Sequence, residues 1–145
     1  MDRTYPAGLM LVTRLDELVE LSEHLGGGYV RFSAGPDADA DGSSADGESG
    51  LALPGLSVTG LRPEPWWQRP ARQWVARRLR QYAHLSGGER YAWVLTGQVC
   101  GRGPDDEPLV CDVHPVAVVD DAVLDEAARV YAETFQPGRL PDKNG

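Results

Sequence analysis

The sequence predicts a single α+β domain in which a small, mostly antiparallel sheet of about four strands packs against about three helices. A chain of 145 residues fits one domain. Its composition, 41% hydrophobic and 25% charged, is that of an ordinary globular protein. The order of helical and strand patterns lacks the regular alternation of a doubly wound sheet. We expect the domain to span residues 1–136 and residues 137–145 to form a flexible tail.

The first helical pattern follows Thr13, whose side chain is expected to cap the helix. Apolar residues recur at helical spacing from Leu15 to Leu25, and glutamates occupy the other side. Three consecutive glycines, residues 26–28, end the pattern. We interpret this segment as an amphipathic helix that packs on the core.

Residues 29–33 alternate in polarity as a strand does, which places Arg31 and Ser33 on the face opposite the core. The next segment, residues 34–50, carries five acidic residues and no basic one, and it is expected to be a mobile acidic loop. Its aspartate spacing matches a calcium-binding EF-hand loop. The two flanking amphipathic helices are missing, so no metal site is predicted.

A second short strand is expected over residues 56–61, and a helix over residues 69–85 after Trp66 and Trp67. Six arginines lie in residues 62–80 against one glutamate. This segment is the one basic feature of a chain with a formal net charge of −8. The overall negative charge opposes nucleic-acid binding, which we do not expect.

Two further strands are expected over residues 91–100 and 109–119, because the first is apolar and β-rich around Trp93 and Val94 and the second contains five valines. The residues between them, 101–108, are rich in turn formers and predict a loop. Asp120 or Asp121 is placed to cap a last helix, which ends near Phe135.

The sequence predicts neither a metal site nor a membrane-spanning segment. The two cysteines, Cys100 and Cys111, lack metal-ligand spacing, and the three histidines lie in different elements. We interpret both cysteines as small, semi-buried thiols of a cytoplasmic protein, although they could face each other across a hairpin. No apolar run approaches the roughly 20 residues that cross a bilayer.

Two charged segments are the strongest candidates for a site. Arg31 stands in a half-buried strand, which requires an anion, a carboxylate or water beside it; a salt bridge to one of the many acids is one alternative and a ligand the other. The loop from Arg102 to Glu107 holds an arginine and three acids. If the two segments adjoin, they form a charged cleft of Arg31, Ser33, Arg102, Asp105 and Glu107. Crowded carboxylates raise one another's pKa, which suits a general acid or base, and Glu107 is the candidate catalytic residue.

Trp66 and Trp67 admit two interpretations. They could wall the cleft as a stacking surface for a ligand, or they could cover the core as a hydrophobic lid. The first hypothesis for function is the binding of a small anionic ligand or a partner protein at the charged cleft. Another is an adaptor that binds partner proteins through the acidic loop or the tryptophan edge.

Several segments together resemble a known family. They are Tyr29–Pro36, Glu48–Gly50, Leu53–Ser57, Glu64–Trp67, Trp74–Leu79, Trp93–Gly97 and Gly101–Val110. In these segments the chain resembles small actinomycete proteins catalogued as a domain of unknown function, over about residues 25–119. The resemblance implies no activity.

Three short motifs also occur in the order found in mono-ADP-ribosyltransferases: Arg31, then Ser57 to Thr59, then Asp105 to Glu107. This resemblance implies an NAD-dependent enzyme in which Arg31 holds the pyrophosphate and Ser57 braces the nicotinamide site. Glu107 would stabilise the oxocarbenium-like ribose as nicotinamide leaves. No cofactor other than NAD follows from either resemblance.

Overall fold

The computed structural model describes residues 5–42, 44–85 and 88–135, and within them it has the predicted α+β architecture. The predicted tail, residues 137–145, lies outside these residues. In chain order the elements are β1 (Met10–Val12), α1 (Leu15–His24), β2 (Tyr29–Ser33), β3 (Ser44–Ala45), β4 (Ala52–Leu53), β5 (Leu56–Ser57), β6 (Thr59–Gly60), α2 (Ala71–Leu79), the 3₁₀-helix η1 (Arg80–Leu85), β7 (Tyr91–Arg102), β8 (Pro108–Val119) and α3 (Asp121–Phe135).

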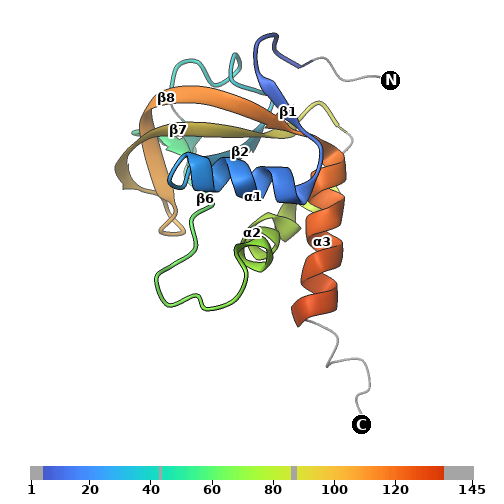
Figure 1. The fold of residues 1–145 in the computed structure, drawn as a ribbon. Helices are drawn as coiled ribbons and strands as arrows, with labels where there is room; N and C mark the ends of the chain where they lie inside the picture. Colours follow the sequence, from blue (N-terminus) through green and yellow to red (C-terminus); the bar gives the residue numbers. More distant parts are fainter. Residues whose placement is uncertain (1–4, 43, 86–87, 136–145) are drawn as a thin grey trace.

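The sheet is larger than the predicted four strands. Its order is β1-β8-β7-β2-β6, and β5 adds a further pairing to β8. The pair β1 and β8 is parallel, whereas the other pairs are antiparallel. Strands β3 and β4 form a separate two-stranded sheet inside and just after the acidic segment. The long β7–β8 hairpin curves through the whole fold, and the three α-helices lie on one side of it (Figure 1).

Alternation along the strands builds a core on each face of the sheet. Val30 of β2 and Val94 of β7 belong to the larger core, together with residues from all three helices. Trp93, the preceding residue of β7 and fully buried, belongs to the smaller core on the opposite face. Arg31 pairs in register with Trp93, so it lies on the face away from the helices, as the alternation of residues 29–33 predicted.

The expected strand over residues 56–61 divides at Val58 into two short strands. Strand β5 pairs with β8, whereas β6 pairs with β2 on the other side of β7. The segment therefore crosses between two parts of the curved sheet. Ser57 lies beside the end of the hairpin, and Thr59 lies nearer the helices.

Two helix boundaries differ from the predictions. The N-cap of α1 is Arg14 without a side-chain hydrogen bond, because Thr13 instead donates its backbone N–H and its hydroxyl to Glu17 Oε1, at 3.0 and 3.3 Å. The helix expected over residues 69–85 begins only after Pro70, which is extended, and it continues as a 3₁₀-helix from Arg80. None of the helices in the described ranges is both long and apolar enough to span a bilayer.

The interpretation of the cysteines as two separate thiols is wrong. Cys100 of β7 and Cys111 of β8 form a disulfide across the hairpin, with their Cα atoms 5.9 Å apart. Gly55 packs directly against this bond, since a Cβ atom there would lie 2.9 Å from Cys100 Sγ. The disulfide therefore fastens the far half of the hairpin where β5 also joins β8.

Candidate functional site

Arg31 is held by an aspartate from the acidic segment. Its Nε lies 2.7 Å from Asp39 Oδ2, and its Nη2 lies 3.3 Å from Asp39 Oδ1, which is a two-pronged ion pair. The side chains are only 15% and 11% exposed. Of the two alternatives for Arg31, the salt bridge is therefore the one that the structure shows.

Ser33 anchors the same aspartate. Its hydroxyl donates to Asp39 Oδ2 and accepts hydrogen bonds from Trp93 Nε1, at 3.0 Å, and from the backbone N–H of Gly35, at 3.1 Å. Ser33 is buried and its hydroxyl is fully engaged. Its place is inside a structural network rather than on a ligand-binding surface.

Ser57 brings the two predicted charged segments together. Arg31 Nη1 donates to the carbonyl oxygen of Ser57 at 2.9 Å. The Ser57 hydroxyl donates to Glu107 Oε2 at 2.7 Å, and Glu107 Oε1 accepts the backbone N–H of Asp105 at 2.9 Å. Arg102 is not part of this chain of contacts, because it is exposed and donates to the carbonyl of Asp106 in its own loop.

The electrostatics of Glu107 differ from the expectation of a raised pKa. The hydrogen bond from Ser57 lowers the pKa of Glu107, and the backbone N–H groups of Glu107 and Asp105 lower it further. Partial burial and the charge of Asp46 act in the opposite direction but are outweighed. Glu107 is therefore a carboxylate at neutral pH. It suits stabilisation of positive charge or acceptance of hydrogen bonds, and the direction of the pKa shift is opposite to the one expected for a general acid or base.

Replacing Ser57 with alanine is expected to destabilise the protein by about 1 kcal/mol at pH 7, because the Glu107 carboxylate loses its strongest hydrogen-bond donor. A carboxyl whose pKa is lowered by folding contributes stability above its unfolded pKa and loses it as pH falls through its folded pKa. The difference between the wild type and Ser57→Ala should therefore shrink on acidification. Urea unfolding at pH 7 and pH 3 measures it, and a difference that grows in acid would contradict the assignment.

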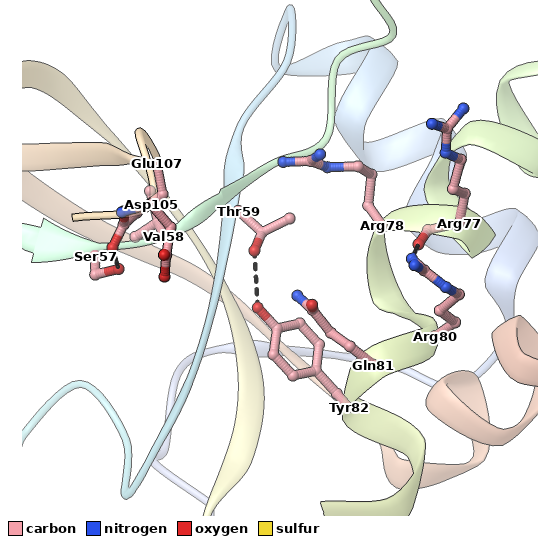
Figure 2. Close-up of a pocket in the computed structure, with 10 residues that line it drawn as sticks. All are labelled: Ser57, Val58, Thr59, Arg77, Arg78, Arg80, Gln81, Tyr82, Asp105 and Glu107. Carbon is pink, nitrogen blue, oxygen red and sulfur yellow. Dashed lines mark hydrogen bonds between the residues drawn. The ribbon is translucent and has the colours of Figure 1, made fainter. Parts of the chain in front are cut away.

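A hollow of about 470 Å³ opens between this carboxylate and helix α2. Ser57 and Thr59 of the β5–β6 segment, with the hairpin tip, form one wall, and the arginines of α2 and η1 form the other (Figure 2). The Thr59 and Tyr82 hydroxyls share a hydrogen bond of 2.7 Å between the walls. We call this cavity the arginine hollow; its lining residues are Ser57, Val58, Thr59, Arg77, Arg78, Arg80, Gln81, Tyr82, Asp105 and Glu107.

The three arginines of the hollow have no acidic partner among the described residues. No carboxylate of residues 5–42, 44–85 and 88–135 lies within 4.0 Å of Arg77, Arg78 or Arg80. The guanidinium of Arg80 lies 4.6 Å from the Tyr131 ring centroid, and that of Arg77 lies 5.8 Å from the Trp74 ring centroid. Arg78 makes a contact of the same kind, with its guanidinium 5.9 Å from the Trp74 ring centroid, so aromatic contacts do not distinguish the three arginines. Burial does, because Arg77 and Arg80 are exposed whereas Arg78 is half-buried.

Arg78 is the arginine that reaches across. Its side chain extends toward Thr59 and the wall that carries Glu107, whereas Arg77 points away (Figure 2). Arg78 is half-buried, and its Nε is buried without a hydrogen-bond partner in the described part of the chain. It is the cation best placed to contact a ligand inside the hollow.

A second hollow of about 450 Å³ shares part of its lining with the first. Arg78, Asp105 and Glu107 line both cavities. Trp74 also lines the second one; it is 6% exposed, and its Nε1 is buried without a partner among the residues that the structure describes. We call this cavity the tryptophan hollow; its lining residues are Gly60, Arg62, Glu64, Trp74, Arg78, Arg102, Asp105, Asp106, Glu107 and Pro108.

Trp66 and Trp67 are not among the residues that line either hollow. They pack with Trp74 in an aromatic cluster, at ring-centroid distances of 5.8 and 5.1 Å, and Trp67 also contacts Phe135 of α3. Trp66 remains 63% exposed. The interpretation as a hydrophobic lid describes them better. Trp74, which the sequence analysis did not single out as a site residue, occupies the position beside the ligand-accessible space.

The acidic segment borders a separate hollow of about 610 Å³ on the other face of the sheet. Its lining includes Asp37, Asp39, Asp41 and Asp112, together with Trp93. In residues 5–42, 44–85 and 88–135 there is no group of three or more histidine, cysteine, aspartate or glutamate side chains placed to hold a metal ion. Because Asp39 is committed to Arg31, this hollow is bounded in part by the structural ion pair.

Comparisons with known proteins add the family but no activity. No curated protein and no solved structure matches the chain. A family model described as "Family of unknown function (DUF6098)" matches residues 5–140, which contain the hairpin, all three α-helices and both hollows. The chain therefore belongs to this family of unknown function, DUF6098.

Proposed function

We propose that this protein binds a small anionic ligand in the arginine hollow, with Arg78 as the principal contact. The observation that carries the proposal is the state of Arg78. Arg78 is half-buried and lines a cavity, and its guanidinium lies 5.9 Å from the Trp74 ring centroid, yet it lacks a carboxylate partner among the described residues. Partly burying a cation without an anionic partner costs desolvation free energy. A bound anion offsets this cost.

Other arginines of the same fold show that acidic partners are available. Arg72, which lies on the same helix α2, bonds both Asp16 and Glu126 at 2.9 Å. Arg31 is held by Asp39. Among the described residues, Arg31, Arg72 and Arg78 are the arginines that are half-buried, and Arg78 is the one of these three without an acidic partner in the described ranges. The planar guanidinium suits phosphate and carboxylate groups, which it can bind through two parallel hydrogen bonds.

Titration with inorganic phosphate in a calorimeter tests this proposal. We expect wild-type protein to bind phosphate and Arg78→Gln to weaken that binding by at least about tenfold, since one charge-assisted contact of about 1.4 kcal/mol is lost. The matched control is Arg129→Gln, an exposed arginine of α3 that lines neither hollow. Equal affinity in Arg78→Gln and the wild type would show that phosphate binds elsewhere and would overturn the proposal.

A second candidate function is NAD-dependent mono-ADP-ribosyl transfer. The hydrogen-bond chain from Arg31 through Ser57 to Glu107 supports it, because it links the three motifs that resemble such enzymes. Glu107 is ionised and faces the arginine hollow, as stabilisation of an oxocarbenium-like ribose requires. Arg31, however, is engaged by Asp39, so this function requires the NAD pyrophosphate to compete with that aspartate.

Release of nicotinamide from NAD separates the two candidates. The enzyme hypothesis requires release by the wild type and its loss in Glu107→Gln, with NAD binding retained. If the protein binds phosphate but releases no nicotinamide from NAD, the enzyme hypothesis is wrong and the ligand-binding proposal stands.

A further inference from the structure

We infer that the anionic ligand of the arginine hollow is a phosphorylated sugar, whose phosphate contacts Arg78 and whose hydroxyl groups contact the opposite wall. This inference rests on the proposed function and specifies the chemical class of its ligand. Three features of the two adjoining hollows support it: the opposite charges of the walls, the neutral polar groups between them, and the buried donors beside Arg78.

The first feature is the separation of opposite charges. Arg78 faces the wall that carries Glu107 and Asp105, yet no ion pair within 4.0 Å joins it to either carboxylate. A ligand between the walls meets a hydrogen-bond donor on one side and acceptors on the other. A purely anionic ion satisfies Arg78 and is repelled by Glu107, whereas a ligand with an anionic end and a donor-bearing end satisfies both walls.

The second feature is the neutral polar surface between the walls. Thr59 and Tyr82 share one hydrogen bond, which leaves one hydroxyl hydrogen and several lone pairs for further partners. Gln81 adds an amide that both donates and accepts. Sugar hydroxyls donate hydrogen bonds to carboxylates, and they also accept hydrogen bonds from hydroxyl and amide groups. An ammonium group can only donate. The polar surface therefore favours a polyol over an amino acid.

The third feature is the incomplete hydrogen bonding of the Trp74–Arg78 face of α2, which borders the tryptophan hollow. Trp74 Nε1 and Arg78 Nε are both buried N–H groups without a partner in the described ranges. Buried donors are nearly always satisfied in folded proteins, so this face is a place where the described residues leave hydrogen-bonding capacity unused. The arginine hollow, at about 470 Å³, lies within the usual range for small-molecule sites and exceeds what a lone phosphate fills.

The test compares three probes by calorimetry at equal ionic strength: ribose 5-phosphate, inorganic phosphate and ribose. We expect ribose 5-phosphate to bind at least about tenfold more tightly than phosphate, which corresponds to about 1.4 kcal/mol for the added hydroxyl contacts. Ribose alone should bind much more weakly than either, because it lacks the group that Arg78 recognises.

Two variants assign the contacts. Arg78→Gln should weaken both phosphate and ribose 5-phosphate. Tyr82→Phe should leave phosphate affinity unchanged and reduce that of ribose 5-phosphate toward it. The matched control is Tyr29→Phe, which lies against the smaller core on the other face of the sheet. Circular dichroism and the unfolding midpoint show whether each variant is folded.

The outcomes separate the two levels of the argument. Equal affinities for phosphate and ribose 5-phosphate, both dependent on Arg78, would overturn the sugar inference and leave the anion-binding proposal intact. Binding of ribose as tight as that of ribose 5-phosphate would overturn both, because the phosphate would then contribute nothing. Absence of binding by phosphate and ribose 5-phosphate alike would also overturn both.

Discussion

Replacing Asp39 with alanine is expected to lower the free energy of unfolding by about 3 kcal/mol at pH 7, the lower end of the cost of breaking a buried ion pair. The substitution leaves the Arg31 guanidinium, whose side chain is 15% exposed, without the carboxylate that engages its Nε and Nη2. It also removes the acceptor of the Ser33 hydroxyl. Urea unfolding followed by tryptophan fluorescence measures the loss.

Asp37 provides the matched control. It is an exposed aspartate of the same acidic segment, two residues away, so Asp37→Ala changes the net charge equally. Exposed substitutions away from specific contacts usually change stability by less than about 0.5 kcal/mol. Similar stability of the two variants would mean that Asp39 does not hold Arg31 in solution.

The sequence predicted those helices and strands whose residues show a regular local pattern of apolar and polar side chains. The alternation of Val30 and Phe32 with polar neighbours predicted strand β2 and its core face, and runs of apolar, β-favouring residues predicted β7 and β8. The three-residue strand β1 was not predicted, because it exists through parallel pairing with β8, more than 100 residues later. The division at Val58 also depends on two partner strands that no local pattern reveals.

The candidate site was predictable only in part. Arg31 was a candidate because it is a cation in a half-buried strand, and Glu107 because it lies in a loop with several charged residues. In the structure, hydrogen bonds link both residues to Ser57. Arg78 was hidden among six arginines of one segment. Which of them lacks an acidic partner depends on tertiary placement: Arg72 finds its partners 54 and 56 residues away.

One sequence signal could have identified the pair that borders the tryptophan hollow. Trp74 and Arg78 are four residues apart on a helix, so they share a face. The guanidinium of Arg78 lies 5.9 Å from the Trp74 ring centroid, as that spacing allows. The spacing does not show that the face borders a cavity, because the opposite wall comes from the β7–β8 hairpin.

The position of that wall depends on how firmly the end of the hairpin is held. Glu107 lies at the tip, in contact with Ser57 of β5, and the Cys100–Cys111 disulfide crosses the hairpin next to the β5–β8 pairing. Register irregularities interrupt the ladder between Thr96 and Gln98 and again between Val99 and Gly101. A third irregularity lies farther away, between Val94 and Leu95. Because two of the three lie close to Cys100, the disulfide compensates for irregular pairing at this end of the hairpin and is important for the geometry of the arginine hollow.

Replacing both cysteines with serine is expected to lower the free energy of unfolding by about 2 kcal/mol, because the cross-link restricts the unfolded chain over a sequence separation of 11 residues. A phosphine reductant should lower the thermal midpoint of the wild type and leave that of Cys100→Ser/Cys111→Ser unchanged, which makes the double variant the control. Alkylation of the denatured wild type without reductant should label neither cysteine. A wild-type midpoint insensitive to reductant, together with two alkylated thiols, would show that the bond is absent in solution. In that case the hairpin tip and its carboxylate wall would depend on the backbone pairing of β5, β7 and β8 and on the Ser57–Glu107 contact.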